Sequence, residues 1–239
     1  MNGFSFGDKS TWDFLMHVEK HPALKGPTRK RTTINVPGRN GALHIDEGSY
    51  TNYHQPYECY FHNDRPMPEL AHSIREWLHS DGGYHRLTDT YDPQHFRRAC
   101  FVGPLDVENH LNKYGRCIVY FDCAPQSFLL SGEHPVQFSS AGVIHNPTYQ
   151  IALPIIKAYG TGAGSITVGG VTIEVNEIAG SLEFDCETEN AYVLLNGGRE
   201  YKNTSISAPK YPTLQPGDNA VSISGDITHI TIIPRWWET

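Results

Sequence analysis

The chain has 239 residues, enough for one large β domain or for two domains of ordinary size. Its 26 acidic residues outnumber its 19 basic residues, and the net charge is -7 at pH 7. Because binding to a nucleic-acid backbone depends on Lys and Arg, this balance argues against specific nucleic-acid binding. No segment approaches the roughly 20 apolar residues that cross a bilayer, and no secretory signal is evident. We therefore expect no membrane insertion, and a protein that is made and kept in the cytosol.

Glycine, proline and cysteine usage narrows the fold class. The 22 Gly and 16 Pro residues indicate many turns and therefore many short strands. The five cysteines are odd in number and never spaced as C-x-x-C, so neither a disulfide framework nor a zinc ribbon is indicated. We expect reduced, mostly buried thiols that act as small apolar side chains. The histidines show no metal-ligand spacing, and neither a metal nor a cofactor is predicted.

The first predicted element is a strand-like opening, GFSFG at residues 3–7. It matches G-x-S-x-G, the motif that presents a nucleophilic serine between a buried strand and a helix. Only two residues precede Gly3, and the following DKST has the composition of a turn, so the structural context of a nucleophile is missing. We interpret Ser5 as structural and predict no catalytic residue and no enzyme.

A basic strand and a tight turn come next. The segment TRKRTTINV at 28–36 leads into the turn Pro37-Gly38-Arg39-Asn40-Gly41. The charges of residues 29–31 could meet an acidic partner, although three charges on a strand are more often simply solvated.

Three further strands in the first half are predicted from alternating apolar side chains. Residues 53–61 place Tyr57, Cys59 and Phe61 on one face, and residues 116–123 alternate in the same way. On residues 96–102, the same rule assigns Cys100 and Val102 to the apolar face.

One helix is predicted between these strands. Its apolar stripe, at i, i+4, i+7 and i+8, consists of Leu70, Ile74, Trp77 and Leu78. Pro68 suits the first turn, where its missing N–H would have no partner, and Gly82 or Gly83 can end the helix in a left-handed conformation. The first half is therefore predicted to be α+β, with the helix lying across a sheet.

The character of the chain changes near residue 140. Because few core candidates occur there, we predict a linker at 134–146 between an N-terminal domain, 1–133, and a C-terminal domain, 147–239. From Gln150 onward there is no helical period, only short apolar strands separated by turns such as Asn196-Gly197-Gly198. This pattern is typical of a β-sandwich or jelly roll.

Two hairpins are predicted in this second domain. Residues 166–168 and 171–175 flank Gly169-Gly170, a pair that accepts the positive φ angles of a tight turn. Residues 222–224 and 227–233 flank Gly225-Asp226 in the same manner.

Other patterns in the second half have both a functional and a structural interpretation. Residues 160–165 (GTGAGS) resemble a phosphate-binding loop, but no helix follows, so a flexible β–β connection is favoured. Glu183, Asp185 and Glu187 share one face of a strand and could hold calcium, but a solvated outer face is favoured because neighbouring carboxylates repel. Trp236 and Trp237 could form a sugar-stacking platform or the edge of a sandwich. Because neighbours on a strand face opposite ways, we expect one to pack inward and the other to contact a partner.

Four N-terminal segments together resemble the N-terminal domain of distal tail proteins from long-tailed, non-contractile bacteriophages. They are GFSFGDKSTWDFLMHVEK at 3–20, RKRTTINVPGRNG at 29–41, the helix around Trp77, and YGRCIVYFDCAPQSF at 114–128. The second half resembles the galectin-like C-terminal domain of these proteins at NP (146–147), LPII (153–156), LQPGDN (214–219) and IIPRW (232–236). The resemblance covers essentially the whole chain.

The resemblance implies a structural virion protein, assembled in the host cytoplasm and located at the phage tail tip. Six subunits would form a ring through their N-terminal domains, with the galectin-like domains projecting outward. The implied partners are the tail tube protein, a tail-associated lysin or fibre, and receptor-binding proteins. The candidate subunit-interface residues are Pro37, Gly38, Arg39, Asn40 and Gly41, and an ordinary exposed turn is an equal alternative for them.

Two other functions have some basis in the sequence. A galectin-like domain could be a carbohydrate-binding module for attachment to the host surface, but the only tryptophans of the second half lie at the C-terminus, away from any His-x-Asn-x-Arg run. A hydrolase is suggested by GFSFG alone.

Overall fold

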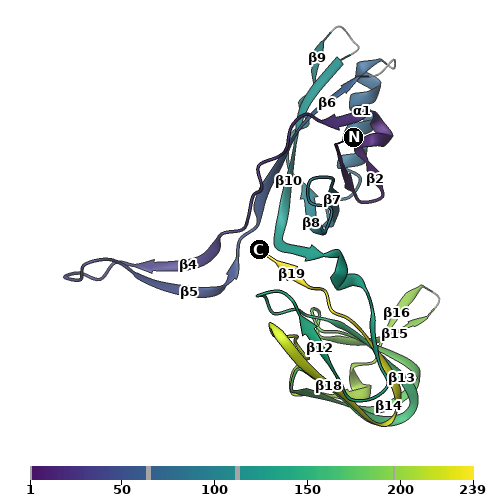
Figure 1. Cartoon of the computed structure of the whole chain (residues 1–239). Helices are drawn as coiled ribbons and strands as arrows, with labels where there is room; N and C mark the ends of the chain where they lie inside the picture. The colour runs from purple at the N-terminus through teal and green to yellow at the C-terminus, as the bar shows by residue number, and fades with distance from the viewer. Residues whose placement is uncertain (1, 63–65, 111–113, 196) are drawn as a thin grey trace. The chain divides into compact units, whose positions relative to one another are not determined.

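The computed structural model consists of two compact units, residues 1–127 with the terminal Thr239 and residues 128–238 (Figure 1). It describes residues 2–62, 66–110, 114–195 and 197–239. Both units are built mainly from antiparallel strands, and α1 (Met67–Leu78) is the one α-helix within these described ranges. The predicted fold class, mainly β with a helix in the first half, is confirmed.

The first unit contains a sheet with the strand order β2-β1-β7-β8-β10-β6-β3, and β9 pairs with β10. Its strands are β1 (Phe4–Phe6), β2 (Lys9–Ser10), β3 (Met16–Val18), β6 (Tyr53–His62), β7 (His85–Asp89), β8 (His95–Phe101), β9 (Glu108–His110) and the first part of β10 (Tyr114–Leu129). β6 and β10 alternate between buried and exposed residues, as predicted from the sequence.

Helix α1 contributes its apolar stripe to the core of this unit. The Trp77 ring stacks on Phe14 at 4.8 Å between centroids, and its Nε1 donates a hydrogen bond to the Phe6 carbonyl oxygen at 3.0 Å. Pro68 lies in the first turn, as predicted. The predicted glycine stop is wrong, because the helix ends at Leu78 and the next residue, His79, has a φ of -99°. Its backbone N–H is already satisfied by the Arg75 carbonyl at 2.9 Å, so no left-handed residue is needed.

The buried face of β8 also differs from the prediction. Arg97 and Ala99 point into the core, whereas Cys100 and Val102 are only half-buried. Arg97 is tolerated there because its guanidinium pairs with Asp89 at 3.0 Å and with Asp92 at 2.9 Å. The alternation rule therefore gave the right strand with its two faces exchanged.

The second unit is an antiparallel sheet with the order β11-β18-β13-β14-β15-β16, with β12 paired to β18 and β17 to β14. Its strands are β11 (Val136–Phe138), β12 (Gly142–Asn146), β13 (Ile155–Val168), β14 (Val171–Asp185), β15 (Asn190–Leu195), β16 (Gly198–Tyr201), β17 (Ile206–Ser207) and β18 (Gly217–Ile233). The short strand β19 (Trp237–Glu238) is not part of this sheet and pairs with β10. Short 3₁₀ turns occur at Thr11–Phe14 in the first unit and at Leu130–Glu133 and Asn203–Ser205 in the second.

The boundary between the units lies earlier in the chain than expected. The division falls between residues 127 and 128, within β10, and the expected linker at 134–146 contains β11 and β12. Both strands pair with β18 through backbone hydrogen bonds, and Ile144 reaches the core. Strands that pair at an edge contribute few buried side chains, so their hydrophobic pattern is weak and resembles that of a linker.

Two glycine-rich segments form strand instead of loops. Residues 160–165 lie within β13, and Gly225 lies within β18, so the predicted flexible connection and the predicted second hairpin are both wrong. Here β13 and β18 pair through register shifts. A Cβ on Gly225 would approach the Ala163 carbonyl oxygen to 2.5 Å, and one on Gly160 would approach the Asp226 carbonyl oxygen to 2.3 Å. The glycines therefore serve close backbone approach at a bulge.

The other predicted hairpin is correct. β13 ends at Val168 and β14 begins at Val171, and the two glycines between them have φ angles of 57° and 79°. Of the predicted turn at 196–198, residue 196 lies outside the described residues, and Gly197 has a φ of 80°.

Candidate functional site: a free-standing hairpin and an acidic pocket

The basic segment near the N-terminus forms a hairpin with a sheet of its own. β4 (Arg29–Ile34) pairs with β5 (Leu43–Tyr50), and every residue of the two strands except the half-buried Tyr50 is exposed. Figure 1 shows this hairpin extending away from β6, the strand that follows it. A two-stranded hairpin is at best marginally stable in water on its own.

The two faces of the hairpin differ in character. Ile34 pairs with Leu43, and Thr32 pairs with Ile45, two positions further along each strand. Directly opposed residues share a face, so Ile34, Leu43 and Ile45 lie on the same side, at 40%, 38% and 46% exposure. The opposite face carries Thr33 and His44. We call the first side the apolar face of the hairpin.

Polar contacts between its two strands fix the base of the hairpin. The Thr51 N–H donates to the Thr28 carbonyl at 2.8 Å, and Arg29 forms an ion pair with Asp46. The Asp46 carboxylate also accepts a hydrogen bond from the Gly48 N–H at 2.9 Å. This hydrogen bond and the Arg29 charge lower the pKa of Asp46. The register is therefore held at the base while the rest of the hairpin stays uncovered.

The tip of the hairpin is the predicted turn. The Val36 carbonyl accepts a hydrogen bond from the Arg39 N–H at 3.2 Å, and Gly38 between them has a φ of 80°. This is the geometry of a type II turn, with Pro37 and Gly38 at its two central positions. All five predicted interface residues, 37–41, are exposed. Arg39 is the one Lys, Arg, Asp or Glu residue between positions 32 and 45, whereas Arg31 lies nearer the base and is directly opposed to Asp46 on β5.

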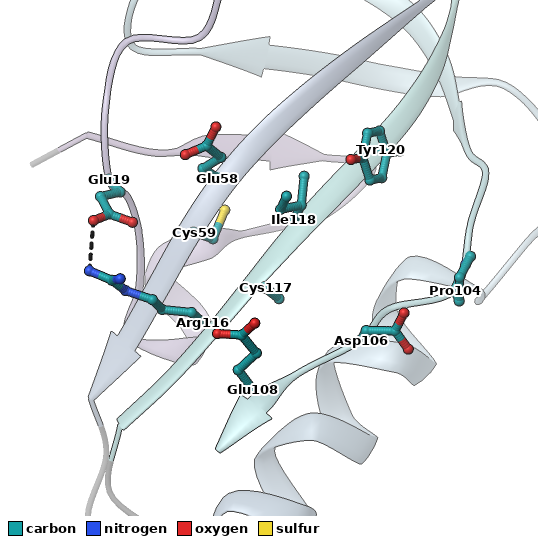
Figure 2. A pocket seen from close by; sticks show the side chains of 10 residues that line it. All are labelled: Glu19, Glu58, Cys59, Pro104, Asp106, Glu108, Arg116, Cys117, Ile118 and Tyr120. Atoms are coloured by element: carbon teal, nitrogen blue, oxygen red, sulfur yellow. Dashed lines mark hydrogen bonds and ion pairs between the residues drawn. The ribbon is translucent and has the colours of Figure 1, made fainter. Parts of the chain in front are cut away.

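A pocket of about 420 Å³ lies on the first unit beside β6 and β10. Figure 2 shows Glu19 and Glu58 to one side of these strands and Asp106 and Glu108 to the other. Two of the carboxylates are paired within the chain, Glu19 with Arg116 at 2.8 Å and Glu58 with Lys20 at 2.8 Å. We call this hollow the acidic pocket.

The surface around the acidic pocket is apolar as well as acidic. Glu58 and Ile118 are directly opposed on β6 and β10, and Arg116 is opposed to Tyr60 on β6 and to Glu108 on β9. On this outer face of the sheet, Tyr60, Ile118 and Tyr120 are 43%, 40% and 41% exposed. Large apolar side chains bordered by carboxylates therefore form a second candidate contact surface.

The inner face of the same strands is a packed core. Cys59 and Cys117 are directly opposed and buried, and their mutual hydrogen bond together with burial raises the pKa of the Cys59 thiol. The Tyr57 hydroxyl donates to Asp89 at 2.6 Å, and its pKa is raised by burial and by the Asp89 charge. Reduced, buried cysteines were predicted, and four of the five are buried. The Cys59 thiol and the Tyr57 hydroxyl beneath the pocket therefore stay protonated at neutral pH.

Ser5 and the two tryptophans near the C-terminus have structural roles. Ser5 lies in the middle of β1, paired on one side with Ser10 and on the other with Thr88. Trp236 is buried in the core of the second unit, and the half-buried Trp237 donates from Nε1 to the Ile151 carbonyl at 2.8 Å. Because the Trp236 ring is enclosed, it cannot serve as the sugar-stacking platform that the carbohydrate-binding hypothesis considers.

The three aligned carboxylates of the second unit form ion pairs. Glu183 pairs with Lys157 at 2.9 Å, and Arg235 pairs with both Asp185 at 2.6 Å and Glu187 at 3.1 Å. Asp185 is buried, so the predicted solvated outer face is wrong at this position. Burial alone would raise the pKa of Asp185, but the Arg235 guanidinium outweighs it and the pKa is lowered. In the described ranges, no group of three His, Cys, Asp or Glu side chains is arranged to hold a metal ion.

Within the described residues, no helix is long and apolar enough to span a bilayer.

No protein-family model matches the chain, and no curated protein matches its sequence. Solved structures do match in fold. The SPP1 Dit (gp 19.1) protein, described as a paradigm of the hub adsorption apparatus in phages that infect Gram-positive bacteria, superposes with a TM-score of 0.71 at 11% identity, covering 97% of this chain and 98% of that one.

Chains of the phage P2 baseplate in its activated conformation, with Ca and with Sr, each give a TM-score of 0.57 at 9% identity over 97% of both chains. The resemblance to distal tail proteins predicted from the sequence is confirmed at the level of the fold, which the chain shares over nearly its whole length with phage hub and baseplate proteins.

Proposed function

We propose that this protein is a structural subunit of a bacteriophage tail tip, a distal tail protein whose copies join into a hexameric ring between the tail tube and the host-adsorption apparatus. The single observation that carries the proposal is the free-standing hairpin β4–β5 with its exposed apolar face. The similarity in fold to SPP1 Dit, a hub protein, and to a phage baseplate chain supports it.

A ring requires a heterologous contact, in which one surface of a subunit meets a different surface of the next. The hairpin suits one half of such a contact because its exposed side chains, Ile34, Leu43 and Ile45, lie together on one face. Burying them against a neighbour would remove apolar surface from water, at about 25 cal/mol per Å². The turn at residues 37–41 is the foremost point of this contact.

The proposed partners are further copies of this chain, the tail tube protein, a tail-associated lysin or fibre, and receptor-binding proteins, all within the virion. No chemical reaction is proposed. A phage tail tip contains many copies in fixed contact, so an assembly surface has a direct use there that a single catalytic cleft does not.

The test compares the wild-type chain with the double variant Ile34→Asp/Leu43→Asp by native mass spectrometry and negative-stain electron microscopy. We expect six-membered rings from the wild type and monomers from the variant, because two carboxylates cannot be buried unpaired at the contact. Leu194→Asp is the matched control, since Leu194 is a similarly exposed apolar residue of the second unit, and it should still form rings. Rings from Ile34→Asp/Leu43→Asp, or a wild type that stays monomeric at every concentration, would contradict the proposal.

A further inference from the structure

Asparagine followed by glycine occurs three times in the chain, at residues 2–3, 40–41 and 196–197. In such a pair the backbone nitrogen of the glycine can attack the side-chain carbonyl carbon of the asparagine, because a residue without a Cβ hinders ring closure least. Residue 196 lies outside the described residues. The other two pairs have very different surroundings, which can be compared.

The pair at the tip of the hairpin β4–β5 is open. Asn40 and Gly41 are both exposed. Within the described ranges, neither the Asn40 side chain nor the Gly41 N–H has a hydrogen-bond partner. Gly41 has a φ of 81°, and a Cβ on it would meet no described atom within 4 Å. The Asn40 side chain and the Gly41 nitrogen are therefore free to approach each other.

The pair at the N-terminus is held in place. The Gly3 N–H donates to Thr90 Oγ1 at 3.2 Å, and the Gly3 carbonyl accepts from the Thr90 N–H at 3.1 Å. Gly3 is buried, and the Asn2 carbonyl accepts a hydrogen bond from the Val18 N–H at 3.1 Å. Ring closure at Asn2 therefore requires a local opening of the fold first.

The hairpin itself supplies a second comparison. Asn35 is exposed like Asn40, but the residue after it is Val36, whose branched Cβ crowds the backbone nitrogen. Asn35 thus has the exposure without the glycine, and Asn2 has the glycine without a free N–H. Among these three asparagines, Asn40 combines both requirements.

We propose that Asn40 is a site of self-modification, at which the side-chain amide is lost and an aspartyl or isoaspartyl residue forms without an enzyme. The Gly41 nitrogen bonds to Asn40 Cγ, the Cγ–Nδ2 bond breaks, and ammonia leaves with the proton of the Gly41 N–H. Water then opens the cyclic imide. Cleavage of the new N–Cγ bond gives aspartate, whereas cleavage between the Asn40 carbonyl carbon and the Gly41 nitrogen gives isoaspartate, in which the main chain continues through Cγ.

The modification changes both the charge and the backbone of the hairpin tip. The new carboxylate is ionised at neutral pH. It lies next to Arg39, the one Lys, Arg, Asp or Glu residue between positions 32 and 45, and balances its charge. Isoaspartate also lengthens the main chain by a methylene group. Because the hydrogen bond between the Thr51 N–H and the Thr28 carbonyl holds the base of the hairpin, the change is confined to the tip.

The test incubates the purified full-length chain, at a dilution at which sedimentation velocity shows monomers, and follows each asparagine by peptide mapping with mass spectrometry. Asn40 should be converted roughly 10-fold or more faster than Asn2 and Asn35, because Asn2 must wait for local opening and Asn35 has a branched neighbour. Conversion should accelerate as the pH rises, because the attack requires loss of the Gly41 amide proton. A protein isoaspartyl methyltransferase should label the peptide that contains residue 40.

Asn40→Gln is the matched variant, because its longer side chain closes a cyclic imide less readily. It changes an exposed residue, so it should keep the wild-type thermal midpoint, and after the same incubation its hairpin peptide should carry no methyltransferase label. An Asn40 amide that persists as long as those of Asn2 and Asn35 would overturn the proposal. Conversion of Asn2 at the same rate as Asn40 would also overturn it, because the surroundings of the pair would then have no influence. All these readings are taken on the separate chain, so they do not depend on the proposed ring.

Discussion

Two hairpins of this protein, the one that joins β13 to β14 and the hairpin β4–β5, share a pattern of alternating apolar residues. The apolar side chains are buried in the first hairpin and exposed in the second. In the first, Ile166 and Ile173 are directly opposed and fully buried. In the second, Ile34 and Leu43 are directly opposed and about 40% exposed. Both have glycines of positive φ in their turns. Alternating apolar residues thus identify a strand and its face, but they do not reveal whether the same chain or a neighbouring molecule covers that face.

This difference separates side chains that stabilise the fold from side chains that the fold leaves exposed. In the second unit, the apolar faces of the long strands close on one another and stabilise the fold. In the first unit, the sheet is completed without β4 and β5, whose apolar face contributes nothing to the core. Equivalent substitutions in the two hairpins should therefore separate folding from association.

The largest contrast is expected when aspartate replaces one isoleucine in each of the two hairpins. Ile173→Asp places an unpaired carboxylate in the core and should lower the free energy of unfolding by more than about 5 kcal/mol, enough to unfold the second unit. Ile34→Asp should change the free energy of unfolding by less than about 0.5 kcal/mol and should weaken self-association. Urea denaturation followed by circular dichroism, together with sedimentation velocity, measures both effects. A destabilised Ile34→Asp monomer would show that the hairpin packs on its own chain.

The second contrast concerns arginine. Arg97→Met leaves Asp89 and Asp92 without their buried partner, and we expect a loss of about 4 kcal/mol in the free energy of unfolding. Arg39→Met, at the exposed hairpin tip, should cost less than about 0.5 kcal/mol. Thermal and urea denaturation of the two variants provide the comparison. Equal stabilities would mean that the Arg97 ion pairs add nothing to the fold.

Arg97 also shows why only part of the fold could be predicted. Alternation located β6, β8 and β10, and helical spacing located the apolar stripe of α1, because each of these elements buries side chains of its own. It assigned the wrong face to β8 because a charged residue is normally placed outward, and the carboxylates that pair with Arg97 lie five and eight residues earlier in the chain. A period-two pattern assigns each residue to a face by its own polarity and does not show which side chains will pair with it.

The candidate site was predictable to a similar extent. The turn at residues 37–41 follows from the local Pro-Gly signal and was found. The acidic pocket was missed, because Glu19, Glu58 and Asp106 come from three separate segments and are brought together only by the order of the sheet. The glycines of β13 and β18 have the local sequence pattern of loops, because their role depends on the neighbouring strand.

The third contrast compares an alanine substitution at a glycine of β18 with one at the tip of the hairpin β4–β5. Gly225→Ala would place a Cβ 2.5 Å from the Ala163 carbonyl oxygen at a φ of 71°, and we expect a cost of about 3 kcal/mol. Gly38→Ala has the same left-handed strain, at a φ of 80°, but meets no neighbouring atom within 4 Å. Its cost should be limited to about 1 kcal/mol, confined to the hairpin. Hydrogen exchange of backbone amides would localise each effect, and similar losses of global stability would contradict the assigned role of close approach at Gly225.

The smallest contrast is between two ion pairs and depends on pH. The folded-state pKa of Asp185 is lowered from 3.8 by Arg235 against the opposing effect of burial. A lowered carboxyl pKa stabilises the fold above its ordinary value, and the stabilisation is lost as the pH falls through the folded-state pKa. Arg235→Gln should therefore lower the free energy of unfolding by about 1–2 kcal/mol at neutral pH, and the difference from the wild type should shrink below about pH 4.

Arg29→Gln removes the corresponding partner of Asp46, whose pKa is also lowered, first by the Gly48 N–H and then by Arg29. Solvent and salt screen this exposed pair, so the variant should follow the wild-type stability curve at every pH. Urea titrations between neutral and acidic pH distinguish the two cases. If Arg29→Gln reproduced the pH-dependent loss expected for Arg235→Gln, the hairpin base would be coupled to global folding, and its role as a separate element available to a neighbour would have to be given up.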